Sequence, residues 1–485
     1  MKSQIEKFST ISDAVKASIA YTIANLFTKG LSIVATPIYT RLMSPEQIGV
    51  VTTFTSWSMI INVFATLTLT SGGFSIAMVE YPNRRNEYIS SIFGLSFLSA
   101  SICLGIYLSF SSYINELLGL TTYQMMAMLC AFLVVPCTNY WICKQRYEFK
   151  FKSVLIITIA QSFLTLISSI LTVIVAKKAG NKNLGEIRTI AMNVIPITFG
   201  FVFAVIVLIK GKKVFDKGFW LFSLKINLPL MVHSLAKHVF DVSDRLMIDK
   251  LRGKSEVGIY GTLYGISSIS LIVWNSINAS LVPLTFEKLK AKHEYELKNV
   301  ITVILLFYAI FASLITLFAP EIIRILTTKV YYNAVYMMPP VAAGIYLTSL
   351  YNVYSNVILY TKKTWMIMIS TMISSVVNIT LNYWLIPSFG YIAAAYTTLG
   401  SYVLLTILII CFTKYIFHKR FCNDKLVIII SIVSILSMQL CNLLYDHIIF
   451  RYLSVILLVV LFIILKNKIL QTIKIFIRKE DSCAG

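Results

Sequence analysis

The sequence predicts an all-α integral membrane protein of about fourteen transmembrane helices, in two six-helix lobes followed by two C-terminal helices. Three observations predict this fold class. Of the 485 residues, 57% are hydrophobic and only 13% are charged. Apolar runs of 18 or more residues recur along the chain, which is the signature of membrane-spanning helices. A short pattern also recurs: a basic residue and Leu, then a β-branched residue, Gly and a second β-branched residue, at 41–50 and again at 250–259. A repeat after an even number of spans predicts two lobes of the same topology with a cavity between them.

The first lobe is predicted to cover residues 1–209. Its spans are expected at about 16–40, 49–70, 88–110, 123–142, 153–176 and 189–209. The N-terminal segment runs into a full span and has no short apolar region before a small-residue cleavage site, so we expect an uncleaved first helix and no signal peptide. A basic cytoplasmic linker at 210–220 separates the lobes.

The second lobe is predicted to cover residues 221–414. Its spans are expected at about 221–248, 257–283, 300–319, 334–360, 364–386 and 390–413. Two more spans follow within 415–465, at about 426–445 and 452–465, although their shortness leaves a count of twelve or thirteen open. The final segment, 466–485, alternates basic and apolar residues and is expected to lie on the inner leaflet.

The charge of the chain is strongly positive, with a formal net charge of +22. Lys and Arg lie mostly on the side of the N-terminus, so the positive-inside rule predicts that both termini are cytoplasmic. Contact with membrane lipids of anionic headgroup accounts for this excess, and no basic segment belongs to a soluble domain that could bind nucleic acid. The eight cysteines form no CxxC pair, so neither a disulfide framework nor a zinc site is expected.

The seventh predicted span carries charges that are costly at membrane depth. His233, Lys237, Asp241 and Asp244 have the spacing i, i+4, i+8 and i+11, which places them on one helix face, and Arg245 follows Asp241 by four residues. Charges in a span usually face a cavity, a partner or a ligand. A charged stripe that lines a substrate cavity is therefore predicted. For Asp244 and Arg245, an alternative is that they reach the nearby membrane interface.

Lys29 is a second cation at depth, because it lies more than about ten residues from either end of the first span. Together with Lys237 it would place one cation in each lobe, a pair suited to a phosphate or diphosphate. No Asp or Glu lies in the core of the first six spans, which argues against export of organic cations. No enzyme motif, metal site or cofactor site is found, and charges beside Asp241 and Asp244 would oppose a metal.

Amide and phenol side chains also lie within the spans, and they suit contacts with sugar hydroxyls as well as ordinary helix packing. The candidates for sugar contact are Asn62, Asn275, Asn352, Asn356 and Tyr351.

Two segments of the chain resemble a known family. The segments 21–30 (YTIANLFTKG) and 37–49 (PIYTRLMSPEQIG) are similar to the opening of Wzx-type flippases of O-antigen or capsule repeat units, in the multidrug/oligosaccharidyl-lipid/polysaccharide (MOP) exporter superfamily. The opening of the second lobe is similar too, with Leu228-Pro229, Asp244-Arg245 and residues 257–260. These motifs distinguish the group well from unrelated transporters, and less well from its lipid II flippase relatives.

The resemblance implies a function and a substrate. The substrate would be an oligosaccharide on undecaprenyl diphosphate, moved by alternating access from the inner to the outer leaflet of the bacterial inner membrane. Lys29, Lys237 and Arg245 would hold the diphosphate or acidic sugars. Asp241, Asp244 and His233 would orient these three cations or couple transport to H⁺ or Na⁺. A polymerase and a chain-length regulator of the same pathway would be partners. A drug, amphiphile or lipid II exporter of the same superfamily remains an alternative, as does a membrane polymerase or glycosyltransferase.

Overall fold

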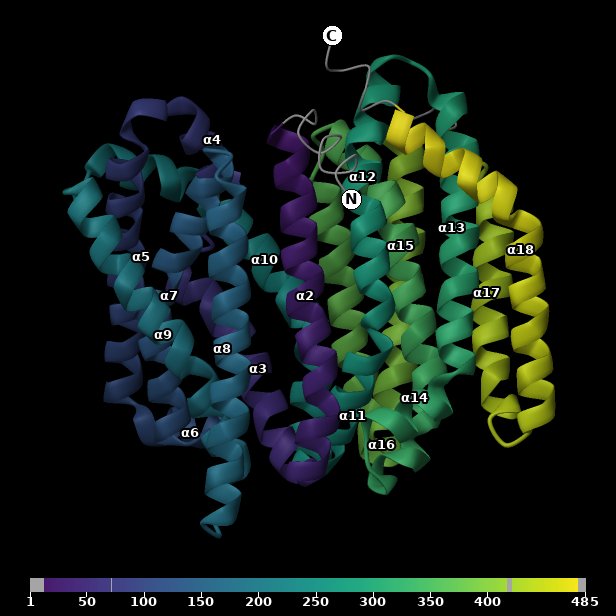
Figure 1. The fold of residues 1–485 in the computed structure, drawn as a ribbon, viewed down its shortest axis with the longest axis horizontal. Helices are drawn as coiled ribbons and strands as arrows, with labels where there is room; N and C mark the ends of the chain where they lie inside the picture. The colour runs from purple at the N-terminus through teal and green to yellow at the C-terminus, as the bar shows by residue number, and fades with distance from the viewer. Residues whose placement is uncertain (1–12, 71, 417–420, 479–485) are drawn as a thin grey trace, which may run out of the picture. The chain divides into compact units, whose positions relative to one another are not determined.

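The computed structural model describes residues 13–70, 72–416 and 421–478, with side chains described from residue 23 to residue 465. Within these ranges the chain forms helices and turns and contains no β-strand (Figure 1). Its contacts divide it into two compact units, Met1–Val242 and Ser243–Gly485. The division falls within one continuous helix, α10, which is where the predicted seventh span lies.

The first unit is built from long helices packed side by side. Helix α9 is central, because α3, α5, α7 and α8 all pack against it, and α2 packs on α8. Two clusters of buried side chains form its core, one around Tyr88 and Tyr140 and one around Met125 and Met128. The helices are α2 (Asp13–Leu42), α3 (Pro45–Thr66), α4 (Gly72–Glu80), η1 (Pro82–Arg84), α5 (Arg85–Ser109), α6 (Ser111–Leu118), α7 (Thr122–Tyr147), α8 (Phe151–Lys178), α9 (Leu184–Gly211) and the part of α10 (Lys217–Arg252) that ends at Val242.

The second unit is also built from long helices packed side by side, and it contains the C-terminal helices α17 and α18. Its most extensive packing is between α15 and α16, and α13 contacts α15 as well as α17 and α18. The helices are α11 (Lys254–Ser267), α12 (Ile269–Lys290), α13 (Glu294–Leu317), α14 (Ala319–Leu326), η2 (Lys329–Met337), α15 (Met338–Tyr360), α16 (Trp365–Ile416), α17 (Asp424–Leu444) and α18 (Ile448–Arg478).

The all-α membrane fold predicted from the sequence is confirmed. Eleven of the described helices are long and apolar enough to cross a membrane. One of them, α16, contains two of the predicted spans, because Gly390 breaks the helix with a φ of 62°. Helices α2 and α15 are 30 and 23 residues long and coincide with two further predicted spans. Each of the fourteen predicted spans therefore has a helical counterpart.

The two copies of the repeated turn make equivalent contacts. Gln47 and Glu256 are the seventh residues of the segments 41–50 and 250–259. The amide of Gln47 donates to the carbonyl of Lys182, and the carboxylate of Glu256 accepts from the backbone N–H of Tyr391. In both cases the partner lies 135 residues further along the chain. The first turn of each repeat thus docks on the turn between its fifth and sixth spans, which supports an internal duplication.

Some local predictions differ from the structure. The predicted eighth span is divided at Ser268 into α11 and α12. Pro339 and Pro340 occupy the first turn of α15. Proline is tolerated there because the first backbone N–H groups of a helix have no intrahelical acceptor. Helix α18 continues without a break to Arg478, through most of the predicted tail at 466–485.

Candidate functional site

Helix α10 carries the five charged or titratable residues that were predicted to form a stripe. It is helical from Lys217 to Arg252, and Pro229 lies inside it. Asp216 begins the helix, since its carboxylate accepts the backbone N–H groups of Gly218 and Phe219 at 3.0 and 3.2 Å. These two bonds satisfy donors that the first turn would otherwise leave without a partner. The helical periodicity predicted for this segment is therefore confirmed.

Lys237 and Asp241 form an ion pair on the exposed side of α10. The Lys237 ammonium is 2.9 Å from Asp241 Oδ2, the i,i+4 pairing expected from the sequence. The Lys237 side chain is 57% exposed and that of Asp241 is 28% exposed. Both residues belong to the first unit, as do His233, which is half-buried, and Lys29.

Asp244 and Arg245 lie three and four residues further on, in the second unit, and their surroundings are different. Asp244 is only 3% exposed. Its carboxylate accepts a hydrogen bond from the buried hydroxyl of Tyr260 and, at 2.7 Å, one from the backbone N–H of Arg245. The guanidinium of Arg245 stacks over the ring of Tyr264 at 4.5 Å. This cluster joins α10 to α11 within the second unit.

A buried network of polar side chains connects Ser243 of α10, the neighbour of Asp244, with α16. The hydroxyl of Ser243 donates to Asn378 Oδ1 at 3.1 Å, and the amide of Asn382 donates to the same oxygen at 3.0 Å. Thr397 in turn donates to Asn382 Oδ1. All four side chains are buried. Such a satisfied network holds helices together, which is the packing role that the sequence left open for these amides.

The other predicted site residues are spread over several helices. Asn356 is buried and donates to Asn278 at 3.0 Å, so its amide bridges α15 and α12. Lys29 is exposed on α2, directly after Thr28, whose hydroxyl is 3.2 Å from Ser162 of α8. The remaining four candidates are partly or fully accessible, and their roles stay predictions: Asn62, Asn275, Asn352 and Tyr351.

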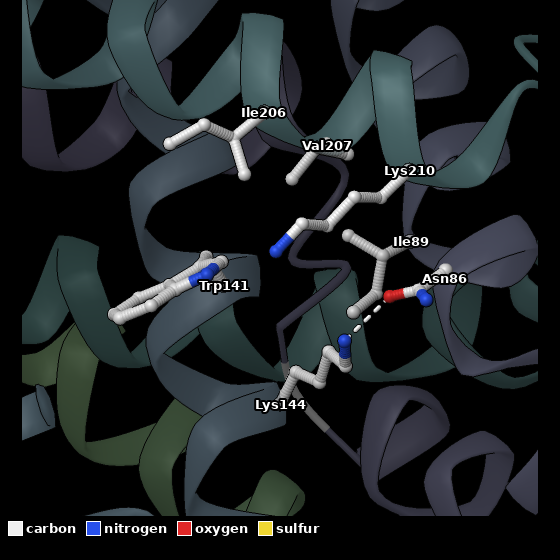
Figure 2. A pocket seen from close by; sticks show the side chains of 7 residues that line it. All are labelled: Asn86, Ile89, Trp141, Lys144, Ile206, Val207 and Lys210. Carbon is white, nitrogen blue, oxygen red and sulfur yellow. Dashed lines mark hydrogen bonds between the residues drawn. The ribbon is translucent and has the colours of Figure 1, made fainter.

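A pocket in the first unit brings together two lysines that are not among the predicted site residues. Figure 2 shows the ammonium groups of Lys144 and Lys210 pointing into a space beside Trp141, with Asn86 at its edge. Lys144 is held by Asn86 and, at 3.2 Å, by Glu148. The cavity has a volume of about 10 Å³. This is room for about one water molecule, so the pocket is too small for a diphosphate.

A comparison with protein families shows to which family the chain belongs. The family of polysaccharide biosynthesis proteins matches residues 14–289, which is more than half of the chain. The chain belongs to this family. The match runs from α2 to α12 and includes Lys29, Lys237, Asp241, Asp244 and Arg245. A second family, MatE, matches residues 229–384. No curated protein matches the sequence.

Solved structures of distant relatives share the fold. The lipid II flippase MurJ in an inward closed conformation is 17% identical, with a TM-score of 0.68, and the alignment covers 95% of this chain and 99% of that one. An inward-facing multidrug resistance MATE transporter of the MOP superfamily is 13% identical, with a TM-score of 0.61, over 80% of this chain and 94% of that one. An outward-facing MATE structure gives a TM-score of 0.56 at 14% identity, over 83% and 94% of the two chains. The polysaccharide biosynthesis protein described here is therefore a multi-pass membrane protein with the MOP fold.

Proposed function

We propose that this protein is a flippase that moves oligosaccharide repeat units, bound to undecaprenyl diphosphate, from the inner to the outer leaflet of the bacterial inner membrane. The observation that carries the proposal is the match to the polysaccharide biosynthesis family over residues 14–289. The MOP fold, shared with a structure described as a lipid II flippase, supports the transport of a lipid-linked substrate. Covalent chemistry is not part of the proposal, because the relatives named above are transporters and flippases.

Lys237 is the first candidate for contact with the diphosphate. It is exposed in an apolar span, and its partner Asp241 is partly exposed, so an anionic ligand can compete for the ammonium. Exposed ion pairs contribute only about 0–1 kcal/mol, a small loss when a diphosphate replaces the carboxylate. Release of Asp241 from Lys237 on substrate binding would also free a carboxylate for H⁺ or Na⁺. Lys29 and Arg245 are further candidates for contact with the anion.

The test uses the native host with the gene deleted and then restored as wild type, Lys237→Ala or Lys225→Ala. Lys225 is a matched control, because it is an exposed lysine on the same helix. Polyprenyl-linked glycans are extracted and surface polysaccharide is measured in parallel. We expect the deletion to accumulate complete lipid-linked repeat units and to lose surface polymer. Lys225→Ala should restore polymer to the wild-type amount, and Lys237→Ala should restore at most about a tenth of it.

Other outcomes would favour other functions. Unchanged surface polysaccharide in the deletion strain would contradict the repeat-unit proposal. The match of the MatE family to residues 229–384 favours an exporter of drugs or other amphiphiles as the second candidate. That function predicts increased sensitivity of the deletion strain to cationic dyes. Single repeat units that reach the outer leaflet but stay unpolymerised would favour a polymerase.

Reporter fusions at both termini test the proposed cytoplasmic location of the chain ends.

A further inference from the structure

A cavity of about 200 Å³ lies in the second unit, where α14 and η2 meet the turn between α17 and α18. Figure 1 shows α14 and this turn at the same end of the unit. We name it the η2 pocket, and its lining residues are Pro320, Ile323, Arg324, Tyr332, Asn333, Val335, Tyr336, Tyr445 and Asp446. In the topology predicted from the sequence, this end of the unit faces away from the cytoplasm.

The floor of the η2 pocket is held in place by hydrogen bonds of Tyr445 and Tyr336. Tyr445 is buried, and its hydroxyl donates to the backbone carbonyl of Thr316 at 2.9 Å. The ring of Tyr336 lies 6.0 Å from that of Tyr445. The Tyr336 hydroxyl donates to the carboxylate of Asp446, whose two oxygens lie 3.1 and 3.0 Å away. Two aromatic rings are thus fixed before any ligand arrives, which lowers the entropy lost on binding.

A second set of contacts braces α14 against α18. The guanidinium of Arg451, which is buried, pairs with Glu321 at the start of α14. The hydroxyl of Tyr452 also donates to Glu321, at 3.3 Å. These contacts hold α14, which supplies Pro320, Ile323 and Arg324 to the lining, against the start of α18. Pockets assembled in this way are usually preformed in the absence of a ligand.

The open side of the η2 pocket carries polar groups that remain available. Arg324 and Asn333 are both exposed, and no hydrogen bond or ion pair with another described residue engages either side chain. The Asp446 carboxylate accepts from Tyr336 and keeps further lone pairs, because a carboxylate accepts about four hydrogen bonds. The pocket thus offers guanidinium, amide and carboxylate groups above an aromatic and aliphatic floor. This combination matches a pyranose ring, whose hydroxyl edge takes paired hydrogen bonds and whose C–H face packs on aromatic rings.

We propose that the η2 pocket is a carbohydrate subsite that binds one neutral or N-acetylated pyranose ring at the outer end of the second unit. The volume is below the ~300–1,000 Å³ that holds a drug-sized ligand, so it suits a single sugar and not a whole repeat unit. As a step in transport, the inference rests on the proposed flippase function. The subsite would then hold one sugar of the repeat unit after it has crossed the membrane. An opposing pair of charges, Arg324 and Asp446, disfavours a strongly anionic ligand there.

The test is saturation-transfer NMR on the purified full-length protein in detergent. The probes are methyl α-D-glucopyranoside, methyl α-D-galactopyranoside and N-acetylglucosamine. Acyclic sorbitol and glycerol 3-phosphate serve as comparison ligands. The Arg324→Ala/Asn333→Ala double variant removes the two available groups and leaves the Tyr336–Asp446 and Arg451–Glu321 contacts intact. Lys329→Ala is the matched control, because Lys329 is an exposed cation of η2 that does not line the pocket. Asp446→Asn provides an independent single-residue variant.

We expect transfer to at least one pyranose probe from the wild type and from Lys329→Ala, and at least about fivefold less from the double variant and from Asp446→Asn. Sorbitol should show none. Absence of transfer to every pyranose, or equal transfer from the double variant, would overturn the inference. Displacement of the probe by glycerol 3-phosphate would also overturn it, in favour of a phospholipid headgroup. The deletion strain distinguishes this inference from the proposed function. If the strain accumulates lipid-linked repeat units but the protein binds no probe, only the carbohydrate subsite is contradicted. If the protein binds a probe but the strain makes unchanged amounts of polymer, only the flippase function is contradicted.

Discussion

Two charged clusters, three residues apart on α10, differ in almost every physical respect. Lys237 and Asp241 form a pair that is open to its surroundings, with side chains 57% and 28% exposed. Asp244 is 3% exposed, and its carboxylate is engaged by Tyr260 and by the N–H of Arg245. The difference teaches that charge in a membrane span has two distinct uses. The buried cluster is committed to holding α10 and α11 together, and the exposed pair keeps groups that a ligand can take.

The largest effect on stability is expected at Asp244. Asp244→Ala would leave the buried Tyr260 hydroxyl without its acceptor, and a buried unsatisfied polar group costs about 1–3 kcal/mol, or more when the lost partner is charged. Asp241→Ala is the comparison, because it removes a carboxylate from an exposed pair worth about 0–1 kcal/mol. The thermal unfolding of each purified variant is monitored by size-exclusion chromatography. The unfolding temperature should fall clearly for Asp244→Ala and only slightly for Asp241→Ala. Equal losses would remove the distinction between the clusters.

A smaller loss is expected in the buried amide network that extends from Ser243. Asn382→Ala removes the donor to Asn378 and the acceptor for Thr397, but Thr397 keeps a second bond to the carbonyl of Ala394 at 3.0 Å. Hydrogen bonds between membrane helices contribute about 0.6 kcal/mol on average, so we expect a loss of about 1–2 kcal/mol. Thr380→Ala, on an exposed face of α16, should unfold at the wild-type temperature. A larger loss than for Asp244→Ala would reverse the proposed order.

The sequence could predict the helices and the exposed pair, because both depend on local spacing. Apolar runs mark the spans, and Lys237 and Asp241 meet because residues four apart lie on one helix face. The partners of Asp244 could not be predicted, since Tyr260 lies 16 residues away across a turn whose geometry depends on packing. Lys144 and Lys210 meet in one pocket for the same reason. Two long-range contacts of the described residues do have a sequence signal, Gln47 with Lys182 and Glu256 with Tyr391, because Gln47 and Glu256 hold the same position in the repeat.

Lys237→Ala should change stability by less than about 1 kcal/mol, because the ion pair that it removes is exposed. Its expected loss of surface polymer, at least about tenfold, would therefore come without a loss of folded protein. Lys237→Arg keeps the cation and should retain most of the polymer. Unfolding temperature, membrane abundance and polymer are measured on the same strains. A parallel fall in abundance and polymer would mean that Lys237 serves the fold, as Asp244 does, and the contrast between the clusters would disappear.

The smallest effect is expected at Asp216, which begins the same helix. The backbone N–H groups of Phe219 and Gly218, with the charges of Lys213 and Arg84, lower the pKa of this carboxyl group below its ordinary value. A carboxyl group with a lowered pKa in the folded state stabilises the fold fully above its ordinary pKa of about 3.9, and this contribution is lost as the pH falls through the lower folded value. Unfolding temperatures measured between about pH 6 and pH 3 should therefore fall less steeply for Asp216→Asn than for the wild type. Since Asn can also cap a helix, the two proteins should differ little at the acid end. A difference that grows as the pH falls would contradict this account and place the pH-sensitive group elsewhere.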